Sequence, residues 1–237
     1  MTDMIEGPVA VLIPAGGRGI RLGGPRKQFR RLGDEPVLVH TLRVFDRHPD
    51  VAHLVVAVPE EARKALLVEL RRVGLTKLTA VVAGGQSRCE SVRAALAATP
   101  PEAGILLVHD AVRPFVDARD IGAVVQGVRR SGAAALGIAV TDSMRYGEDG
   151  RFGESVSRKG LYRMQTPQGF RRDWFERAHR LAEERRLAAT DDVEIVMQVG
   201  QSVEIIAGSW RNLKITTPED WEFAQLLWAH RELREGN

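Results

Sequence analysis

The sequence contains a single cysteine, Cys89, among 237 residues. One cysteine cannot form a disulfide within the chain, so a scaffold held by internal disulfides is excluded and a reducing compartment is expected. No apolar run reaches the about 18 residues that a transmembrane helix needs. The first seven residues contain two acids and no base, unlike a signal peptide. We therefore expect a cytoplasmic protein that has no membrane partner.

Neither sign of charge dominates, because 34 Lys and Arg residues face 31 Asp and Glu residues and leave a formal charge of +3. A nucleic-acid-binding protein would gather its bases on one face, with aromatic residues between them. Here arginines alternate with glutamates along 60–72 and 176–186, a pattern typical of solvated helix faces. No nucleic-acid partner is therefore expected, and nucleic-acid binding is kept as an alternative function.

Several common catalytic and cofactor signatures are missing. The six histidines show no spacing typical of zinc ligands, and Cys89 has no motif partner for thiol catalysis. The Gly-Lys-Ser/Thr ending of a P-loop is absent. No acidic residue ends a predicted strand about 20 residues beyond the first glycine-rich loop, where a dinucleotide-binding fold would place it. We expect no metal site built from protein ligands, and a nicotinamide-dependent oxidoreductase is not supported.

What the sequence does contain is a regular alternation of strand-like and helical segments. Val9–Pro14 is a continuous apolar run, as expected for a strand buried on both faces. Strands separated by helices predict right-handed crossovers and an α/β fold with a mainly parallel, twisted sheet covered by helices on both faces. The predicted strands are 9–14, 53–58, 79–83, 105–108, 133–140 and 203–206. The predicted helices are 36–45, 60–73, 87–98, 120–130, 173–186, 191–199 and one that begins near Thr217.

The alternation stops between Thr141 and Gln165, where the sequence is polar and rich in glycine. Within it, Glu148-Asp149-Gly150 lies between short alternating runs and predicts a β-hairpin turn. The alternative is a plain surface loop, but a long segment without a core of its own is more often functional or partner-facing. We therefore expect a protruding β-hairpin arm at about 141–165.

The strongest candidate binding site follows the first strand, where residues 14–23 read PAGGRGIRLG. Small residues at this place let backbone N–H groups approach a phosphate chain closely. The loop also lies at the carboxyl edge of the predicted sheet, where open α/β sheets bind ligands. We interpret this segment as a loop that wraps a triphosphate and adds the cations Arg21 and Lys27. The alternative, a glycine-rich surface turn with solvated bases, fits this position in the fold less well.

Two further loops follow predicted strands. Gly84-Gly85 leads into a helix N-terminus at Ser87, which suits contact with a ligand, although helix capping alone would explain the pattern. His109-Asp110 follows the strand at 105–108, and an aspartate there can hold a ribose hydroxyl or a phosphate-bound Mg²⁺. Arg113, three residues on, suits bidentate phosphate binding. No role is assigned to His109.

The cations near these loops indicate a site for two anionic substrates. Two like unit charges 4 Å apart repel by about 4 kcal/mol at an effective dielectric constant near 20, so joining two phosphates requires nearby cations and Mg²⁺. A phosphomonoester, with a second pKa of about 6, is already an ionised nucleophile at neutral pH and needs no general base. The pattern therefore favours nucleotidyl transfer onto a phosphate. The cations concerned are Arg21, Lys27, Arg113, Arg158 and Lys214.

The chain contains the motifs IPAGGRGIRLG with KQF, AGGQSRCESV, HDAVRPF, TDSMR, TPQGF, TDDVE and NLKITTPED. These motifs, in this order and spacing, resemble the 2-C-methyl-D-erythritol 4-phosphate cytidylyltransferases of the non-mevalonate isoprenoid pathway. The resemblance covers nearly the whole chain. It implies a single Rossmann-like nucleotidyltransferase domain over 1–237 that transfers a cytidylyl group from CTP to methylerythritol phosphate. Ribitol 5-phosphate, or another polyol or sugar phosphate, is the alternative acceptor.

The resemblance also implies roles for individual residues. Arg21 and Lys27 would be catalytic and would stabilise the α-phosphate during in-line attack. Mg²⁺ would lie mainly on the CTP phosphates. The family's arm interlocks with a second subunit, so a homodimer is expected in which Ser143 and Arg158 serve the partner's site. The implied CTP-binding residues are Ala15, Gly16, Gly17, Gly19, Gly85, Ser91 and Asp110. The implied substrate-binding residues are Arg113, Ser143, Arg158, Thr166 and Lys214.

Overall fold

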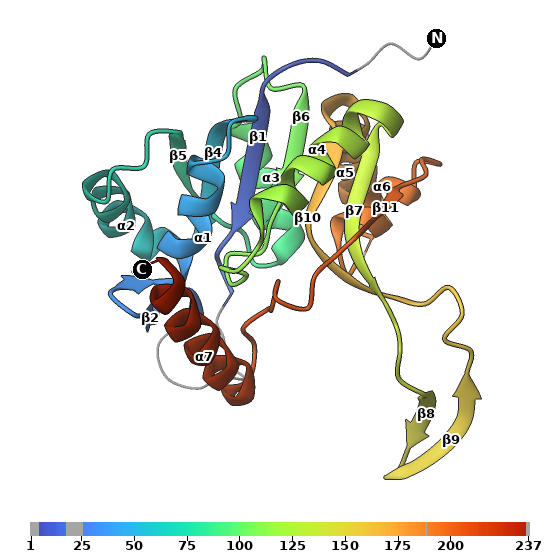
Figure 1. Cartoon of the computed structure of the whole chain (residues 1–237). Helices are drawn as coiled ribbons and strands as arrows, with labels where there is room; N and C mark the ends of the chain where they lie inside the picture. The colour runs from blue at the N-terminus through green and yellow to red at the C-terminus, as the bar shows by residue number, and fades with distance from the viewer. Residues whose placement is uncertain (1–4, 18–25, 188, 236–237) are drawn as a thin grey trace.

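The computed structural model describes residues 5–17, 26–187 and 189–235, and a seven-stranded sheet forms its centre (Figure 1). Its strands are β1 (Val9–Pro14), β4 (Val51–Val58), β5 (Leu78–Ala83), β6 (Ile105–Val108), β7 (Ala133–Ala139), β10 (Tyr162–Arg171) and β11 (Glu204–Ala207). Across the sheet the order is β11-β7-β10-β6-β1-β4-β5. Neighbouring strands pair in parallel except at β10, which runs antiparallel to both β6 and β7. The prediction of a mainly parallel α/β sheet is confirmed.

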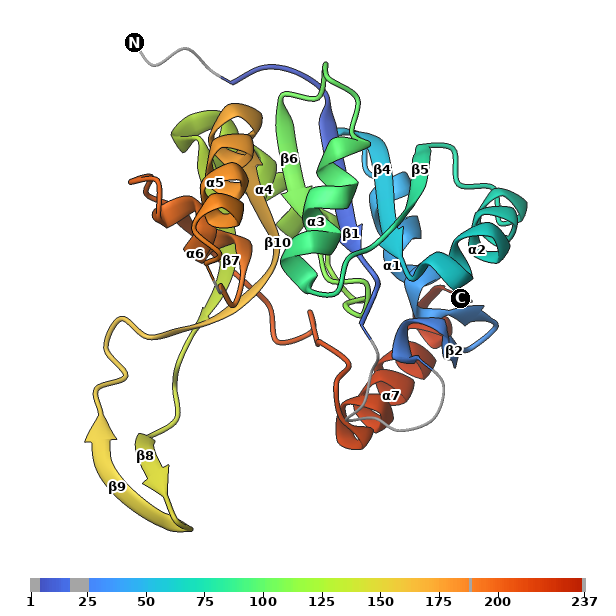
Figure 2. The same ribbon diagram turned by 180° about the vertical axis from the view of Figure 1, so that it is seen from behind.

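Helices cover both faces of this sheet, as predicted (Figures 1 and 2). Residues of α1, α2 and α4 pack with one face, and residues of α3, α5 and α6 pack with the other. The predicted helices recur within a few residues of their expected bounds. The helices are α1 (Val37–Asp46), α2 (Glu60–Arg72), α3 (Arg88–Ala97), α4 (Ala118–Ser131), α5 (Arg172–Glu184), α6 (Asp192–Met197) and α7 (Pro218–Glu235).

The central strand β1 shows why the sheet is buried on both faces. Val9, Val11 and Ile13 belong to the apolar cluster on one face, whereas Ala10 and Leu12 belong to the cluster on the other. All five side chains are 0% exposed, because successive residues of a strand point to opposite faces. The continuous apolar run in the sequence follows from this double burial.

The arm is a separate hairpin of β8 (Met144–Glu148) and β9 (Arg151–Val156) that extends away from the sheet (Figure 1). Glu148 pairs with Arg151, so the turn consists of Asp149 and Gly150. Their φ angles of 49° and 74° are both positive, as a two-residue type I′ turn requires, and Asp-Gly is a preferred sequence for it. The predicted hairpin and its turn are confirmed.

The sequence analysis did not predict β10, although this strand lies in the middle of the sheet. Its segment contains Pro167 and the polar residues Gln165 and Gln168, which are typical of a loop. Gly169 is required because a Cβ there would lie 2.7 Å from Val128 Cγ2 of α4. Close helix packing and buried polar contacts thus replace the apolar pattern of an ordinary inner strand.

The last helix, α7, begins where it was predicted, next to Thr217. Asp220 Oδ2 accepts hydrogen bonds from the backbone N–H groups of Thr216 (2.8 Å) and Thr217 (2.9 Å), and Thr217 Oγ1 accepts one from Asp220 N–H (3.2 Å). Such reciprocal capping satisfies donors that a helix N-terminus leaves unpaired. A small hairpin of β2 (Arg31–Leu32) and β3 (Glu35–Pro36), which was not predicted, lies against α7. Within the described part of the chain, no helix is long and apolar enough to cross a membrane.

Candidate active site

The loops that follow β1, β5 and β6 border one cavity of about 700 Å³. Carboxyl ends of parallel strands meet at the same edge of a sheet, which is where α/β proteins bind ligands. The three loops that the sequence singled out are therefore neighbours. The predicted site residues that line the cavity are Ala15, Gly16, Gly17, Lys27, Gly85, Ser91, Asp110 and Lys214. Gly19 and Arg21, also predicted, lie outside the described residues.

The loop after β1 is held by Gln28, to which the sequence analysis gave no role. Gln28 Nε2 donates hydrogen bonds to the carbonyl oxygens of Ala15 (2.6 Å) and Gly17 (3.1 Å), and the side chain is only 2% exposed. Gln28 lies in a short 3₁₀ helix, Lys27–Phe29. The same turn that holds the glycine loop therefore also brings Lys27 to the cavity.

Ser91 brings the first two glycine loops together. Its Oγ lies 3.3 Å from the position that a Cβ would take at Gly16 and 2.8 Å from the corresponding position at Gly84. At Gly85, a Cβ would lie 2.2 Å from the Cβ of Glu90, so any side chain there would displace the first turn of α3. Glycine is needed at 84 and 85 because helix α3 approaches this loop so closely.

Asp110 lies where three basic side chains meet. Its Oδ2 lies 2.9 Å from Lys214 Nζ and 3.1 Å from Arg113 Nε, and its Oδ1 lies 3.7 Å from Arg88 Nε. Burial alone would raise the pKa of the Asp110 carboxyl, but Lys214, Arg88 and Arg113 outweigh burial and hold that pKa well below its usual range. Asp110 is therefore ionised at neutral pH, and the cations around it outnumber its single charge.

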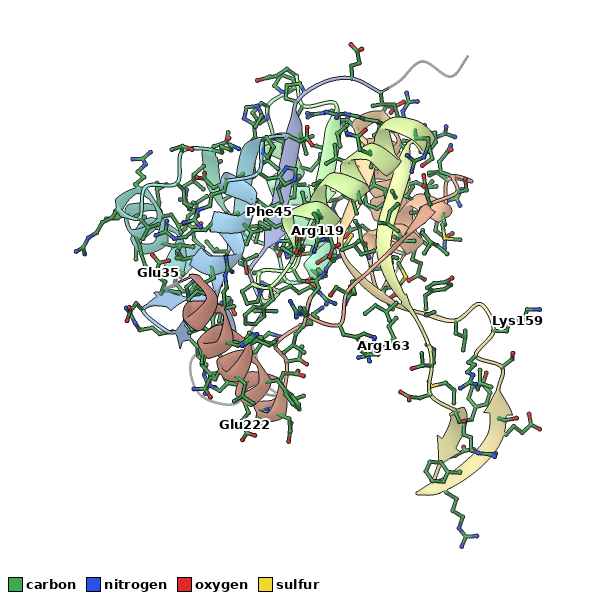
Figure 3. All side chains as sticks on the ribbon, viewed as in Figure 1. Glu35, Phe45, Arg119, Lys159, Arg163 and Glu222 are labelled. Carbon is green, nitrogen blue, oxygen red and sulfur yellow. The ribbon has the colours of Figure 1, made fainter. Side chains whose placement is uncertain are left out.

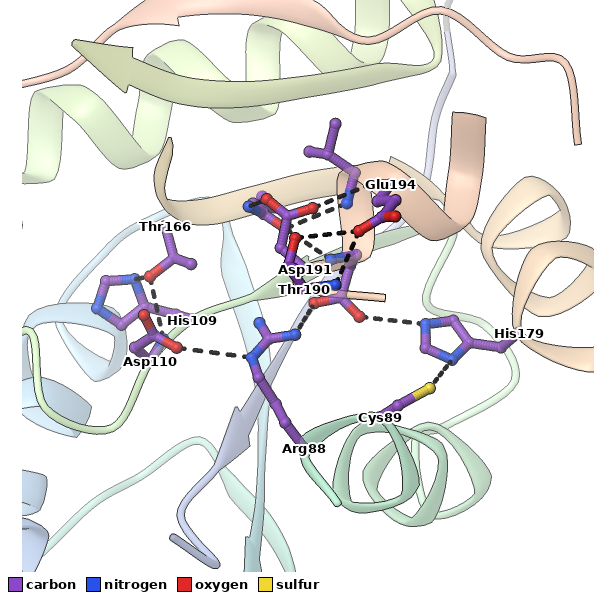
Figure 4. A network of polar contacts seen from close by, with 12 residues as sticks. Arg88, Cys89, His109, Asp110, Thr166, His179, Thr190, Asp191 and Glu194 are labelled. Atoms are coloured by element: carbon purple, nitrogen blue, oxygen red, sulfur yellow. Dashed lines mark hydrogen bonds and ion pairs between the residues drawn. The ribbon is translucent and has the colours of Figure 1, made fainter. Parts of the chain in front are cut away.

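His109 and Thr166 fix the backbone of Asp110 from behind the cavity (Figure 4). His109 Nε2 lies 3.2 Å from the carbonyl oxygen of Arg113, which can only accept, so Nε2 carries the proton. His109 Nδ1 then accepts from the Thr166 hydroxyl at 3.1 Å, and Thr166 Oγ1 accepts the Asp110 N–H at 3.0 Å. Burial lowers the pKa of His109 to about 3, so its ring is neutral and structural near pH 7.

Arg113 and Thr166, which were predicted to bind the second substrate, lie outside the lining of the cavity. The Arg113 guanidinium is buried and donates to Asp110 Oδ2 (3.1 Å) and to the carbonyl oxygen of Asn212 (2.7 Å). Asn212 Nδ2 in turn donates to the carbonyl oxygen of Thr166 (2.8 Å). These bonds attach the segment that carries Lys214 to Asp110, so Arg113 sets the distance between the two.

A second charged cluster adjoins Asp110 (Figure 4). Arg88, the first residue of α3, places Nη1 2.6 Å from Asp192 Oδ2 while its Nε faces Asp110. Asp192, the first residue of α6, is 0% exposed, and its Oδ1 lies 3.2 Å from His179 Nε2. The sequence analysis gave Arg88 no role, because the contact spans 104 residues and leaves no local pattern.

Ser143 and Arg158, the predicted substrate-binding residues of the arm, are exposed and lie outside the lining of the cavity. Arg158 Nη1 donates to the carbonyl oxygen of Thr141, across the base of the arm. The neighbouring Lys159 side chain points away from the sheet (Figure 3). Across the residues that the structure describes, no group of three or more His, Cys, Asp and Glu side chains could hold a metal ion.

The fold and the cavity define an α/β protein of the class that binds ligands with glycine-rich loops at the carboxyl edge of its sheet. The family model described as 2-C-methyl-D-erythritol 4-phosphate cytidylyltransferase matches residues 9–230. The protein of that name from Salinibacter ruber is 56% identical over 220 residues, which cover 93% of this chain and 92% of that protein. This chain therefore belongs to the 2-C-methyl-D-erythritol 4-phosphate cytidylyltransferase family.

Solved structures agree with this assignment. The crystal structure of 2-C-methyl-D-erythritol 4-phosphate cytidylyltransferase from Thermus thermophilus matches with a TM-score of 0.80 and 34% identity, covering 94% of this chain and 99% of that one. The 4-diphosphocytidyl-2C-methyl-D-erythritol synthase of Anaerococcus prevotii has a TM-score of 0.83 at 22% identity, covering 94% and 96%. At that identity, the second match supports the fold alone.

Proposed function

We propose that this chain transfers the cytidylyl group of CTP to 2-C-methyl-D-erythritol 4-phosphate and releases pyrophosphate. A phosphate oxygen of the polyol attacks the α-phosphorus of CTP, and the bond from that phosphorus to the bridging oxygen of the β-phosphate breaks. The observation that carries the proposal is the shared cavity, in which the loop Ala15–Gly17 meets Lys27, Asp110 and Lys214. Family membership narrows the reaction to cytidylyl transfer.

The described residues suggest how each part of CTP would be bound. The backbone of Gly16 and Gly17 suits the triphosphate, and Lys27 would stabilise charge on the α-phosphate as pyrophosphate leaves. Gly85 and Ser91 would contact the cytosine, and Asp110 the ribose. Gly19 and Arg21 would complete the triphosphate site, and Arg21 would act together with Lys27 in catalysis.

No side chain needs to act as a general base in this proposal. His109 is neutral and both of its ring nitrogens are already hydrogen bonded, so it cannot take a proton from the substrate. The attacking group is an ionised phosphate, which is nucleophilic without deprotonation. Catalysis would rest on orientation and on cations that face the developing charge.

A divalent cation on the CTP phosphates completes the proposal. Asp110 offers the hard oxygen ligands that Mg²⁺ prefers, but Lys214, Arg113 and Arg88 already face those oxygens. The donor set therefore fits an ion that is held mainly by phosphate oxygens, with Asp110 beside it. When bound, Mg²⁺ would supply charge neutralisation of the triphosphate, and the protein's own residues would orient the two substrates.

We also propose that the protein is a homodimer joined through the arm. Large apolar side chains gather there, with Phe152 88% exposed and Tyr146 67% exposed. Exposed apolar groups that cluster in this way are typical of an interface. In such a dimer, Ser143 and Arg158 would reach the partner's cavity and help Lys214 to position the polyol phosphate. Arg113 and Thr166, which lie outside the cavity lining, would support that site through Asp110.

The unpaired Cys89 thiol suits a reducing compartment, which supports the cytoplasm as the location.

The proposal is tested by measuring pyrophosphate release from CTP, Mg²⁺ and methylerythritol phosphate. We expect turnover by the native protein, and a fall in kcat of about 100-fold or more in Lys27→Ala. The matched control is Lys64→Ala, an exposed lysine of α2 that does not line the cavity. A native protein without turnover, or one that prefers ribitol 5-phosphate by kcat/KM, would refute the assigned reaction. A Lys27 variant as active as the control would refute the assigned residue.

A further inference from the structure

The charged side chains next to Asp110 alternate in sign, and this series of charges runs through Arg88 to His179 (Figure 4). Lys214 faces Asp110, Asp110 faces Arg88, Arg88 faces Asp192, and Asp192 faces His179. Each carboxylate therefore has a cation on either side. This series of charges connects Asp110 in the cavity to the buried pair of His179 on α5 and Asp192 on α6.

Arg88 is the residue that connects the two halves of this series of charges. Its side chain is 30% exposed and lines the cavity, yet its Nη1 forms a 2.6 Å hydrogen bond to Asp192, which has no exposed surface. Its Nε, at the other edge of the guanidinium, lies 3.7 Å from Asp110 Oδ1. A planar guanidinium presents donors in fixed directions, so anchoring one edge on Asp192 fixes where the other edge points.

The Asp192 anchor is itself held from several sides. His179 Nε2 lies 3.2 Å from Asp192 Oδ1, and Gln168 Oε1 accepts the backbone N–H of Asp192 at 3.1 Å. Burial would lower the pKa of His179, but Asp192 and Cys89 outweigh burial and raise it, which favours the imidazolium beside Asp192. The position of Arg88 is therefore set by the core and not by solvent.

We propose that Arg88 is a positioning residue of the nucleotide site: held by Asp192, it fixes the Asp110 carboxylate through Oδ1. This inference rests on the proposed function, in which Asp110 binds the ribose of CTP. Lys214 and Arg113 both lie against Oδ2, so Arg88 supplies the cation on the opposite oxygen. Without it, the carboxylate would turn toward Lys214 and lose the orientation that CTP requires.

The test is Arg88→Lys, which keeps a positive charge near Asp192 but cannot reach both carboxylates with separate donors. We expect KM for CTP to rise about tenfold, a size usual for coupled charged neighbours. The value of kcat should change less than twofold, on the order of experimental scatter between variants, and KM for methylerythritol phosphate should not change. The melting temperature should stay close to that of the native protein, since the buried ion pair with Asp192 is kept.

Two further variants separate positioning from a general effect on folding. Asp192→Asn removes the anchor, so it should raise KM for CTP, and the double variant with Arg88→Lys should be no worse than the more impaired single variant. Arg93→Lys is the matched control, because Arg93 also lies on α3 and its Nε lies 3.5 Å from Glu183 Oε1, but it does not line the cavity. It should leave both KM values unchanged.

The outcomes distinguish this inference from the function on which it rests. A native protein that releases no pyrophosphate overturns both. Normal turnover, with Arg88→Lys leaving KM for CTP unchanged, overturns the inference alone. The same holds if Arg88→Lys lowers kcat and raises KM for both substrates equally, or if Arg93→Lys reproduces its effect. A selective rise in KM for CTP supports the positioning role.

Discussion

Thr166 provides a test of how the site is held together, because its hydroxyl makes two hydrogen bonds inside the protein. The hydroxyl donates to His109 Nδ1 at 3.1 Å and accepts the Asp110 N–H at 3.0 Å, and Thr166 is 4% exposed. Thr166→Val keeps the shape of the side chain and removes both hydrogen bonds. His109 Nδ1 and the Asp110 N–H would then be buried without partners.

The size of the effect follows from these two orphaned groups. Leaving a buried donor or acceptor unsatisfied costs about 1–3 kcal/mol, so two of them should destabilise the fold by about 3 kcal/mol in total. For a domain of this length, that corresponds to a fall in melting temperature of about 6–12 °C. Urea unfolding followed by circular dichroism gives the free energy directly, and scanning calorimetry gives the melting temperature.

Matched variants decide whether the hydrogen bonds are responsible. Thr166→Ser keeps the hydroxyl and should recover most of the lost stability. Thr99→Val removes a hydroxyl that donates only to the carbonyl oxygen of Ala95, at 2.9 Å, so it should cost less than Thr166→Val. If Thr166→Val were as stable as the native protein, the assignment of the His109 tautomer and its polar contacts would be wrong.

Two other predictions follow from the arm and from the buried histidine. Phe152→Asp places a charge at a position whose native side chain is 88% exposed. In sedimentation velocity it should convert a dimer into monomers, and the melting temperature should not fall. A dimer that persists would contradict an interface through the arm. His179 has a raised pKa, so its ion pair with Asp192 stabilises the fold fully below the ordinary value of 6.5, and this contribution is lost as the pH rises through the raised pKa. Urea unfolding should therefore show a stability gap between native protein and His179→Gln that is largest below pH 6.5 and narrows above it; a gap independent of pH would contradict the ion pair.

The elements that were predicted correctly share one physical property: their burial requires apolar residues at regular positions, and the sequence shows this pattern locally. β1 and β6 have the same bounds in prediction and structure, since strands covered on both faces consist almost wholly of apolar residues. β10 lacks that pattern because Gln165, Thr166 and Gln168 lie inside it, and the side chain of each makes a hydrogen bond to a distant segment. A strand stabilised by such contacts cannot be recognised from its own sequence.

The candidate site divides in the same way. Glycines 84 and 85 and Asp110 directly follow strands, so the sheet topology alone brings their loops to one edge. Arg88 and Gln28 were missed because each acts through a partner that is remote in the chain: Asp192 for Arg88, and the carbonyl oxygens of the first loop for Gln28. Sequence patterns thus identified much of the cavity lining, together with Arg113 and Thr166, which lie outside it, whereas the holding roles of Arg88 and Gln28 emerged only from the structure.

The arrangement around Asp110 explains how a cavity for two anions can exist before either is bound. Lys214, Arg113 and Arg88 would repel one another by about 4 kcal/mol per pair at 4 Å and an effective dielectric constant near 20. Asp110 lies within 2.9 to 3.7 Å of all three, so it stabilises the group as a unit. Arg88 also pairs with Asp192, so two carboxylates face these three cations and do not cancel all of their positive charge. In the proposed reaction, Asp110 would hold these cations together while their remaining positive charge would attract the substrate phosphates, and a preorganised field of this kind needs no rearrangement during the reaction.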